Sequence, residues 1–156
     1  SWKKIKLYKN TLRALKKIND RNYLIIIITN QSIIARKIAK KSEIDFLHKC
    51  LKKFLKKKNI NLSSIYICPH HPKFNIRCNC RKPNNGLILK AKKKFNIDLK
   101  RSWLIGDKTS DIKAGKKSGL KTILVKTGYG GLDKKYKVKP DYVFKNLYEA
   151  ASKLNY

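Results

Sequence analysis

The stretch that decides the fold is Tyr23-Leu-Ile-Ile-Ile-Ile-Thr-Asn-Gln-Ser32. Its first six residues are apolar or aromatic, so the strand they predict must be covered on both faces, as in the middle of a parallel sheet. We expect this strand over Tyr23–Ile28 and a polar turn over Thr29–Ser32. In α/β proteins, ligand sites lie beyond the carboxyl ends of the strands, which is where this turn falls.

Helical and strand patterns alternate along the rest of the chain. We expect helices over residues 8–20, 42–58, 86–95, 110–118 and 147–154, strands over residues 64–68, 102–105, 121–126 and 142–144, and a glycine-rich turn over residues 127–131. This alternation predicts an α/β fold with a doubly wound, Rossmann-like parallel sheet. Ser42, with Asp45 three residues later, has the spacing of an N-terminal helix cap.

The chain of 156 residues carries 40 basic and only 9 acidic residues, a formal net charge of +31. Such a charge suggests a nucleic-acid partner. We discount that partner, because nearly all the charge is lysine, and abundant Lys, Asn, Ile, Tyr and Phe are typical of A/T-rich genes. No apolar run is long enough to span a bilayer. We therefore expect neither a nucleic-acid nor a membrane partner. The sequence does not determine the oligomeric state, and a monomer is the default expectation.

Three of the four cysteines and two of the three histidines lie in one polar loop, Cys68–Gly86. The candidate metal ligands form two pairs, Cys68 with His70 and Cys78 with Cys80. Two thiol-containing pairs suffice to close a tetrahedron around Zn²⁺. Spacing alone leaves open whether His70 or His71 is the ligand, and buried thiols or a disulfide are the alternative to a metal site.

The remaining cysteine, Cys50, falls close to the apolar stripe of the helix predicted over residues 42–58, and we expect it in the core. A thiol-rich metal loop together with an odd extra thiol favours a reducing compartment. We therefore expect the protein in the cytoplasm.

Phosphate-binding side chains follow the predicted strands. Arg81 and Lys82 come directly after the last thiol, and they suit a phosphate as a fork and a point charge respectively. Thr29 and Ser32 offer hydroxyls, and their turn offers backbone N–H groups. We expect the polar turn, the thiol loop and Asp107 to converge at one edge of the sheet.

Carboxylates are scarce, which makes Gly106-Asp107-Lys108-x-x-Asp111 informative. Asp107 follows a buried strand and is a candidate ligand for Mg²⁺, a hard cation that takes one or two carboxylates plus water and phosphate oxygens. Asp111 would orient the metal's water or Lys108, and its alternative role is to cap the next helix. We find no nucleophile paired with a base.

In combination and in the same order, three motifs resemble the phosphatases of the haloacid dehalogenase (HAD) superfamily. They are Thr29-Asn30-Gln31-Ser32-x-x-Ala35-Arg36, then Cys68-Pro-His-His-Pro with Cys78-x-Cys80-Arg81-Lys82-Pro83 and Gly86, and finally Gly106-Asp107-Lys108-x-x-Asp111-x-x-Ala114-Gly115. The resemblance is strongest to the D-glycero-D-manno-heptose 1,7-bisphosphate 7-phosphatase family, with histidinol-phosphate phosphatases as near relatives.

This resemblance implies a Mg²⁺-dependent phosphatase that works through an aspartyl-phosphate, in the biosynthesis of ADP-heptose and the lipopolysaccharide core. Thr29 would steady the phosphoryl group and Lys82 would neutralise its charge. The residues it implies for substrate binding are Thr29, Asn30, Gln31, Ser32, Arg81, Lys82 and Lys108. Asp107, supported by Asp111, would hold Mg²⁺. A structural Zn²⁺ would sit on Cys68, His70, Cys78 and Cys80.

The family's first motif, a strand ending in Asp-x-Asp, has no counterpart in this sequence, and we expect it before Ser1. Its two aspartates are the nucleophile and the general acid/base. The prediction is thus one HAD-like phosphatase domain over residues 1–156 that lacks this strand, with a gap in the sheet beside Leu24–Ile28 and almost no activity on its own. Ile33 and Asn85 stand where the family has Gly and Pro, and Ile33 would be strained if that position needed a positive φ.

Two alternatives stay open at this point. The same chemistry would serve histidinol phosphate or a polynucleotide 3′-phosphate. A different class, a non-catalytic basic zinc-bearing nucleic-acid-binding module, would explain the charge, but few exposed aromatic residues are interleaved with arginine.

Overall fold

The computed structural model describes residues 6–154. The chain divides into two compact units, Ser1–Cys78 and Asn79–Tyr156. Each contains a parallel sheet with helices packed against it, and they are described separately below as the N-terminal unit and the C-terminal unit.

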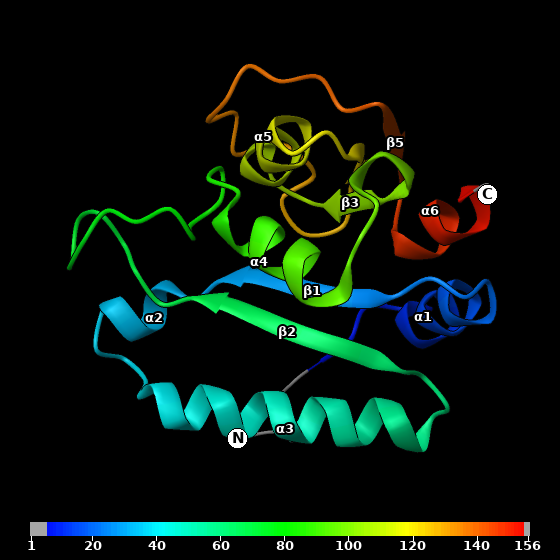
Figure 1. Cartoon of the computed structure of the whole chain (residues 1–156), viewed down its shortest axis with the longest axis horizontal. Coiled ribbons are helices and arrows are strands. Elements are labelled where there is room, and N and C mark those ends of the chain that lie inside the picture. Colours follow the sequence, from blue (N-terminus) through cyan, green and yellow to red (C-terminus); the bar gives the residue numbers. More distant parts are fainter. Residues whose placement is uncertain (1–5, 155–156) are drawn as a thin grey trace. The chain divides into compact units, whose positions relative to one another are not determined.

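Over residues 6–78, the N-terminal unit contains two parallel strands and three helices. Its elements are α1 (Thr11–Asp20), β1 (Ile25–Asn30), α2 (Ser32–Ala35), α3 (Lys41–Lys57) and β2 (Leu62–Cys68). Strand β1 pairs with β2, and their last residues, Asn30 and Cys68, are partners in this pairing. Helix α3 runs alongside β2 (Figure 1). Because the two strands are parallel and in register at their ends, whatever follows β1 lies next to whatever follows β2.

Apolar residues on one face of each helix explain this packing. In α3, Ile44 and Leu55 are 4% and 1% exposed, which fixes the helix against the sheet. The N-terminus of α3 is capped by Glu43, whose carboxylate accepts a hydrogen bond of 2.7 Å from the Lys40 N–H. Asp45 instead pairs with Lys41 on the exposed surface.

The C-terminal unit contains three parallel strands in the order β3-β4-β5. Its elements are α4 (Gly86–Phe95), the 3-10 turn η2 (Leu99–Arg101), β3 (Trp103–Gly106), α5 (Thr109–Lys117), β4 (Lys121–Val125), β5 (Tyr142–Phe144) and α6 (Leu147–Lys153). The β-branched residue Ile123 of β4, together with Ile112 and Ala114 of α5, forms a core that is almost completely buried. Gly106, the last residue of β3, lies beside Leu124 near the end of β4.

The parallel α/β fold is therefore confirmed, and helix α4 and strand β5 have the expected bounds. Three local predictions were wrong. Strand β1 extends through Thr29 and Asn30, because the ladder with β2 continues over these polar residues. The cap of α3 is Glu43 rather than Ser42 with Asp45, and α2 occupies part of the expected turn.

Two further expectations concern single residues. Cys50 is half-buried, so it lies at the margin of the core. Ile33 lies within helix α2, where φ is negative, and it is therefore not strained. Within residues 6–154, no helix combines the length and the apolar character that crossing a membrane requires.

Candidate functional site

The ends of β1 and β2 hold the first group of expected site residues. Thr29 and Asn30 are the last two residues of β1. The Gln31 N–H donates a hydrogen bond of 2.8 Å to the carbonyl oxygen of Cys68, so the chain stays beside β2 after the strand ends. Ser32 then begins the short helix α2. The Gln31 N–H is thereby engaged within the fold and is not available to a ligand.

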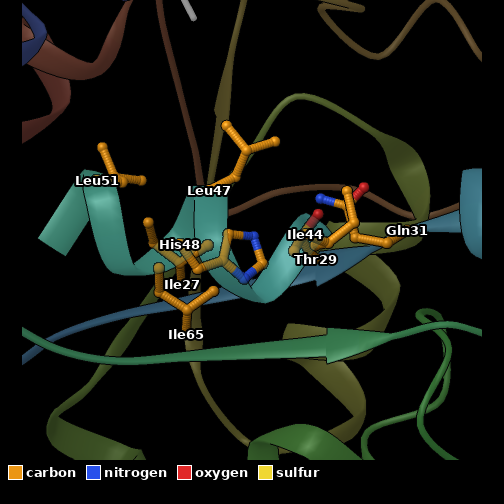
Figure 2. A pocket seen from close by; sticks show the side chains of 8 residues that line it. All are labelled: Ile27, Thr29, Gln31, Ile44, Leu47, His48, Leu51 and Ile65. Atoms are coloured by element: carbon orange, nitrogen blue, oxygen red, sulfur yellow. The ribbon is translucent and has the colours of Figure 1, made fainter. Parts of the chain in front are cut away.

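Thr29 and Gln31 also line a pocket of about 240 Å³ between α3 and the strands. They lie together at one end of it, and Leu51 lies at the other (Figure 2). The rest of the lining is apolar except for His48. Burial lowers the pKa of His48, with Asp45 acting against this shift and Lys41 adding to it.

The thiol loop brings its expected ligands together. One ligand atom from each of Cys68, His70, Cys78 and Cys80 lies within 4.8 Å of all the others. The Sγ atoms of Cys68 and Cys78 are 3.5 Å apart, and none of the four cysteines forms a disulfide. In a tetrahedral zinc site with Zn–S bonds of about 2.3 Å, ligand atoms are roughly 3.8 Å apart, so this donor set fits Zn²⁺.

The two histidines, which sequence spacing did not distinguish, have different surroundings. His70 belongs to the group of four ligands. The Nδ1 atom of His71 accepts a hydrogen bond of 3.3 Å from the Lys73 N–H, and its ring packs against Phe74. The geometry therefore favours His70 as the fourth ligand.

Arg81 and Lys82 follow the thiols on a segment held against the start of α4. The Gly86 N–H donates a 2.9 Å hydrogen bond to the Asn79 carbonyl oxygen. A Cβ at position 86 would come within 2.5 Å of that oxygen, so only glycine allows the close approach. Asn85, which stands where the family has Pro, has φ −109° and precedes α4 without strain.

Lys82 forms a buried ion pair with Asp111 of α5. Their Nζ and Oδ1 atoms are 2.7 Å apart, and the side chains are only 13% and 8% exposed. The other carboxylate oxygen of Asp111 accepts a 3.0 Å hydrogen bond from the Lys108 N–H. Asp111 thus caps α5, which was the alternative role expected for it, and it also holds Lys82.

Asp107 follows β3 and is held by the turn after β4. Its Oδ2 atom accepts a 2.8 Å hydrogen bond from the Tyr129 N–H, and its carbonyl oxygen accepts one of the same length from the Gly131 N–H. Gly128 makes this contact possible: its φ is +74°, and a Cβ there would overlap the Asp107 carboxylate. Two short segments of the C-terminal unit, residues 81–82 and 107–111, thus carry several of the expected site residues. The segments are joined by the ion pair between Lys82 and Asp111.

Sequence reasoning missed the residues that hold this segment in place. Asp133 accepts hydrogen bonds from the N–H and the hydroxyl of Thr109, at 2.9 and 2.7 Å. The Lys108 Nζ lies 3.7 Å from the centroid of the Tyr129 ring. The signal in the sequence is the glycine-rich turn over residues 127–131, which predicts a turn but does not reveal that the turn belongs to a site.

Comparison with known proteins places the chain in a family. Residues 79–150 match the HAD-hydrolase-like family. The chain is 45% identical over 122 residues to D-glycero-alpha-D-manno-heptose-1,7-bisphosphate 7-phosphatase of Photorhabdus laumondii, covering 74% of this chain and 67% of the relative. It is 38% identical over 123 residues to D-glycero-beta-D-manno-heptose-1,7-bisphosphate 7-phosphatase of Pasteurella multocida, covering 76% and 67%.

Among solved structures, the chain is similar to D,D-heptose 1,7-bisphosphate phosphatase from B. bronchiseptica complexed with magnesium and phosphate. The TM-score is 0.88 at 25% identity, covering 99% of this chain and 86% of that one. Fold and site together define a HAD-type hydrolase. More narrowly, the chain belongs to the D-glycero-D-manno-heptose 1,7-bisphosphate 7-phosphatase family.

Proposed function

We propose that the protein is a Mg²⁺-dependent phosphatase that removes the 7-phosphate of D-glycero-D-manno-heptose 1,7-bisphosphate, on the route to ADP-heptose and the lipopolysaccharide core. The observation that carries this proposal is the Lys82–Asp111 pair, whose carboxylate also binds the N–H of Lys108, the residue after Asp107. A lysine held by a carboxylate next to a second, oriented carboxylate suits a phosphoryl group that arrives with a metal ion. The similarity to heptose bisphosphate phosphatases supplies the substrate class.

In this mechanism each residue has one task. Lys82 would neutralise the negative charge of the transferring phosphoryl group, and Thr29 would steady it with its hydroxyl. Arg81 and Lys108 would hold the substrate's other oxygens. The family resemblance also implies substrate binding by Asn30, Gln31 and Ser32. Because the Gln31 N–H is already bonded to Cys68, Gln31 would contribute its side-chain amide.

Asp107 would hold Mg²⁺. Asp111 would support this site by binding the Lys82 ammonium and the Lys108 N–H. The oxygen donors of Asp107 suit a hard cation. When bound, Mg²⁺ would neutralise charge on the phosphoryl oxygens. The hydrogen bond from the Tyr129 N–H to Oδ2 would keep this carboxylate oriented.

The nucleophile in this proposal is the first aspartate of an Asp-x-Asp motif, which the 156 residues do not contain. On this view the 156 residues would bind and orient the phosphate, and the carboxylate of that motif would attack phosphorus.

The thiol cluster would hold a structural Zn²⁺. Four protein ligands leave no open position for water, so the metal would stabilise the loop and take no part in the chemistry. A zinc site of this kind needs reduced thiols, which supports a location in the cytoplasm. Atomic absorption of the purified protein tests this assignment and should give about one zinc per chain.

The test of the function is phosphate release by the protein encoded by the whole reading frame. Three substrates distinguish the candidate functions: heptose 1,7-bisphosphate as either anomer, histidinol phosphate, and an oligonucleotide with a 3′-phosphate. We expect phosphate release from heptose bisphosphate, and we expect it to require Mg²⁺. Lys82→Met should reduce kcat/KM for this substrate by about a hundredfold or more. Faster phosphate release from histidinol phosphate or from the oligonucleotide would contradict the proposal and identify that compound class as the substrate. Strongly salt-dependent DNA binding without any turnover would also contradict it.

A further inference from the structure

The turn that follows β4, residues 126–131, touches both Asp107 and Lys108, although the sequence predicts it only as a turn. Its base is fixed on the neighbouring strand: the Lys126 N–H donates to the Phe144 carbonyl oxygen at 2.9 Å, and the Thr127 N–H donates to that of Lys145 at 3.2 Å. Its last residue is fixed as well, because the Gly131 N–H donates to the Asp107 carbonyl oxygen at 2.8 Å. The turn is therefore anchored at both ends, and the side chain at its centre is presented in a defined place.

Tyr129 stands at the centre of this turn and makes two different contacts. Its backbone N–H donates to Oδ2 of Asp107 at 2.8 Å. Its ring faces the Lys108 ammonium, with Nζ 3.7 Å from the ring centroid. This separation is well inside the distance of about 6 Å within which a cation is attracted to an aromatic face.

Burial does not explain why Tyr129 lies there, because its side chain is 53% exposed. An aromatic ring left in solvent gains little from packing. Its contact with a lysine directly after Asp107 restricts where that ammonium can lie. A flexible lysine side chain otherwise loses rotamer freedom when it grips a ligand, and a ring that already restricts it lowers this cost.

We propose that Tyr129 is a positioning residue for phosphate binding, holding Lys108 with its ring and Asp107 with its backbone N–H. The inference rests on the proposed function, in which Lys108 contacts substrate and Asp107 holds the cation. Tyr129 itself would not touch the reacting atoms. It would fix the position of the Lys108 ammonium before the substrate binds.

The chain offers a matched control in Tyr136. This tyrosine lies on the same connection between β4 and β5, and its ring is also next to a lysine, with the Lys113 Nζ 4.5 Å from its centroid. Lys113 is exposed on α5 and has no part in the proposed site. Tyr136→Leu therefore removes a similar contact from the same connection without touching Lys108.

The experiment compares Tyr129→Leu, Tyr129→Phe and Tyr136→Leu in the full-length protein. The first readout is the affinity for inorganic phosphate in the presence of Mg²⁺, by calorimetry. The second is the separation of KM from kcat with heptose 1,7-bisphosphate. We expect Tyr129→Leu to weaken phosphate binding and raise KM by about two- to fivefold, the range of an exposed cation–π contact, with kcat little changed.

Tyr129→Phe should restore wild-type affinity, because the ring face and not the hydroxyl meets the ammonium, and Tyr136→Leu should leave affinity unchanged. The inference is overturned if Tyr129→Leu binds phosphate as the wild type does, or if Tyr129→Phe is as weak as Tyr129→Leu. If the wild type binds phosphate but releases none from heptose bisphosphate, the proposed function fails while the affinity series still decides the role of Tyr129.

Discussion

Acidic residues have different roles in the two units. The N-terminal unit has three, all at the start or end of helices: Asp20, Glu43 and Asp45. Two of them form exposed i,i+4 pairs, Lys16–Asp20 and Lys41–Asp45. The C-terminal unit has six, of which four bind a lysine or a backbone group that is distant in the sequence: Asp107, Asp111, Asp133 and Asp141.

The difference teaches where to look for a site in a chain with this much positive charge. Exposed pairs between a lysine and a carboxylate contribute little, because water screens both charges. A carboxylate that is buried, or that binds backbone far away in sequence, must be held by the fold. The N-terminal unit supplies strand-end hydroxyls and three of the four candidate zinc ligands, whereas the C-terminal unit supplies carboxylates that fix lysines.

The largest effect should come from the thiol ligands. Cys78→Ser removes one of four zinc ligands, and we expect loss of bound zinc with a fall in unfolding free energy of about 4 kcal/mol, a fraction of what structural zinc contributes to a zinc finger. Metal analysis and urea unfolding measure the two effects. His71→Ala is the matched control and should keep its zinc, whereas His70→Ala should lose it. Zinc retained by His70→Ala and lost by His71→Ala would reverse the assignment.

The buried pair of the C-terminal unit should come next. Asp111→Asn leaves the Lys82 ammonium without its carboxylate at 13% exposure, and we expect the unfolding free energy to fall by about 3 kcal/mol. Asp45→Asn breaks an exposed pair of the N-terminal unit and should cost less than about 0.5 kcal/mol. Urea unfolding of both variants at pH 7 tests the contrast, and equal losses would remove it.

Gly128 and Gly119 offer a smaller and more selective test. Both have φ near +75°, but a Cβ at 119 meets no atom within 4 Å, whereas one at 128 would overlap the Asp107 carboxylate. Gly119→Ala should cost about 1–2 kcal/mol from backbone strain alone. Gly128→Ala should cost more and should also weaken Mg²⁺-dependent phosphate binding. If the two variants bind phosphate equally well, Gly128 has no bearing on Asp107.

The smallest effect concerns Asp141 and pH. A hydrogen bond from the Lys116 side chain, assisted by the N–H and hydroxyl of Thr122, lowers the pKa of Asp141 to about 2 despite some opposing desolvation. Since the unfolded value is about 3.8, its stabilising contribution is complete above about pH 5 and is lost as the pH falls towards 2. The stability difference between wild type and Asp141→Asn should therefore shrink between about pH 5 and about pH 2.5. A difference that stays constant over this range would rule out the linkage.

Much of this arrangement was predictable from local pattern. The alternation of apolar strands and amphipathic helices predicts parallel sheets, because burial of both strand faces and one helix face leaves few other folds. Spacing also predicted the three thiols of the ligand group, since Cys68 ends a strand and Cys78 and Cys80 return on one short loop, but it left His70 and His71 open. The role of Asp111 as a cap was likewise readable from its place three residues after Lys108.

What the sequence did not predict depends on contacts between distant segments. Tyr129 reaches Asp107 over 22 residues, and Asp133 reaches Thr109 over 24, so no local spacing reveals either contact. The end of β1 was misplaced for a related reason: Thr29 and Asn30 are polar, but the ladder with β2 satisfies their backbone groups and keeps them extended.

The most direct test of the central claim, that Asp111 holds Lys82 for use on a phosphoryl group, is kcat/KM for release of the 7-phosphate. It should be measured on Asp111→Asn in the full-length protein, at a temperature where circular dichroism shows the variant to be folded. The account predicts a loss of about tenfold or more, because Lys82 leaves its place, with Asp45→Asn unchanged. A folded Asp111→Asn variant with wild-type kcat/KM would contradict it.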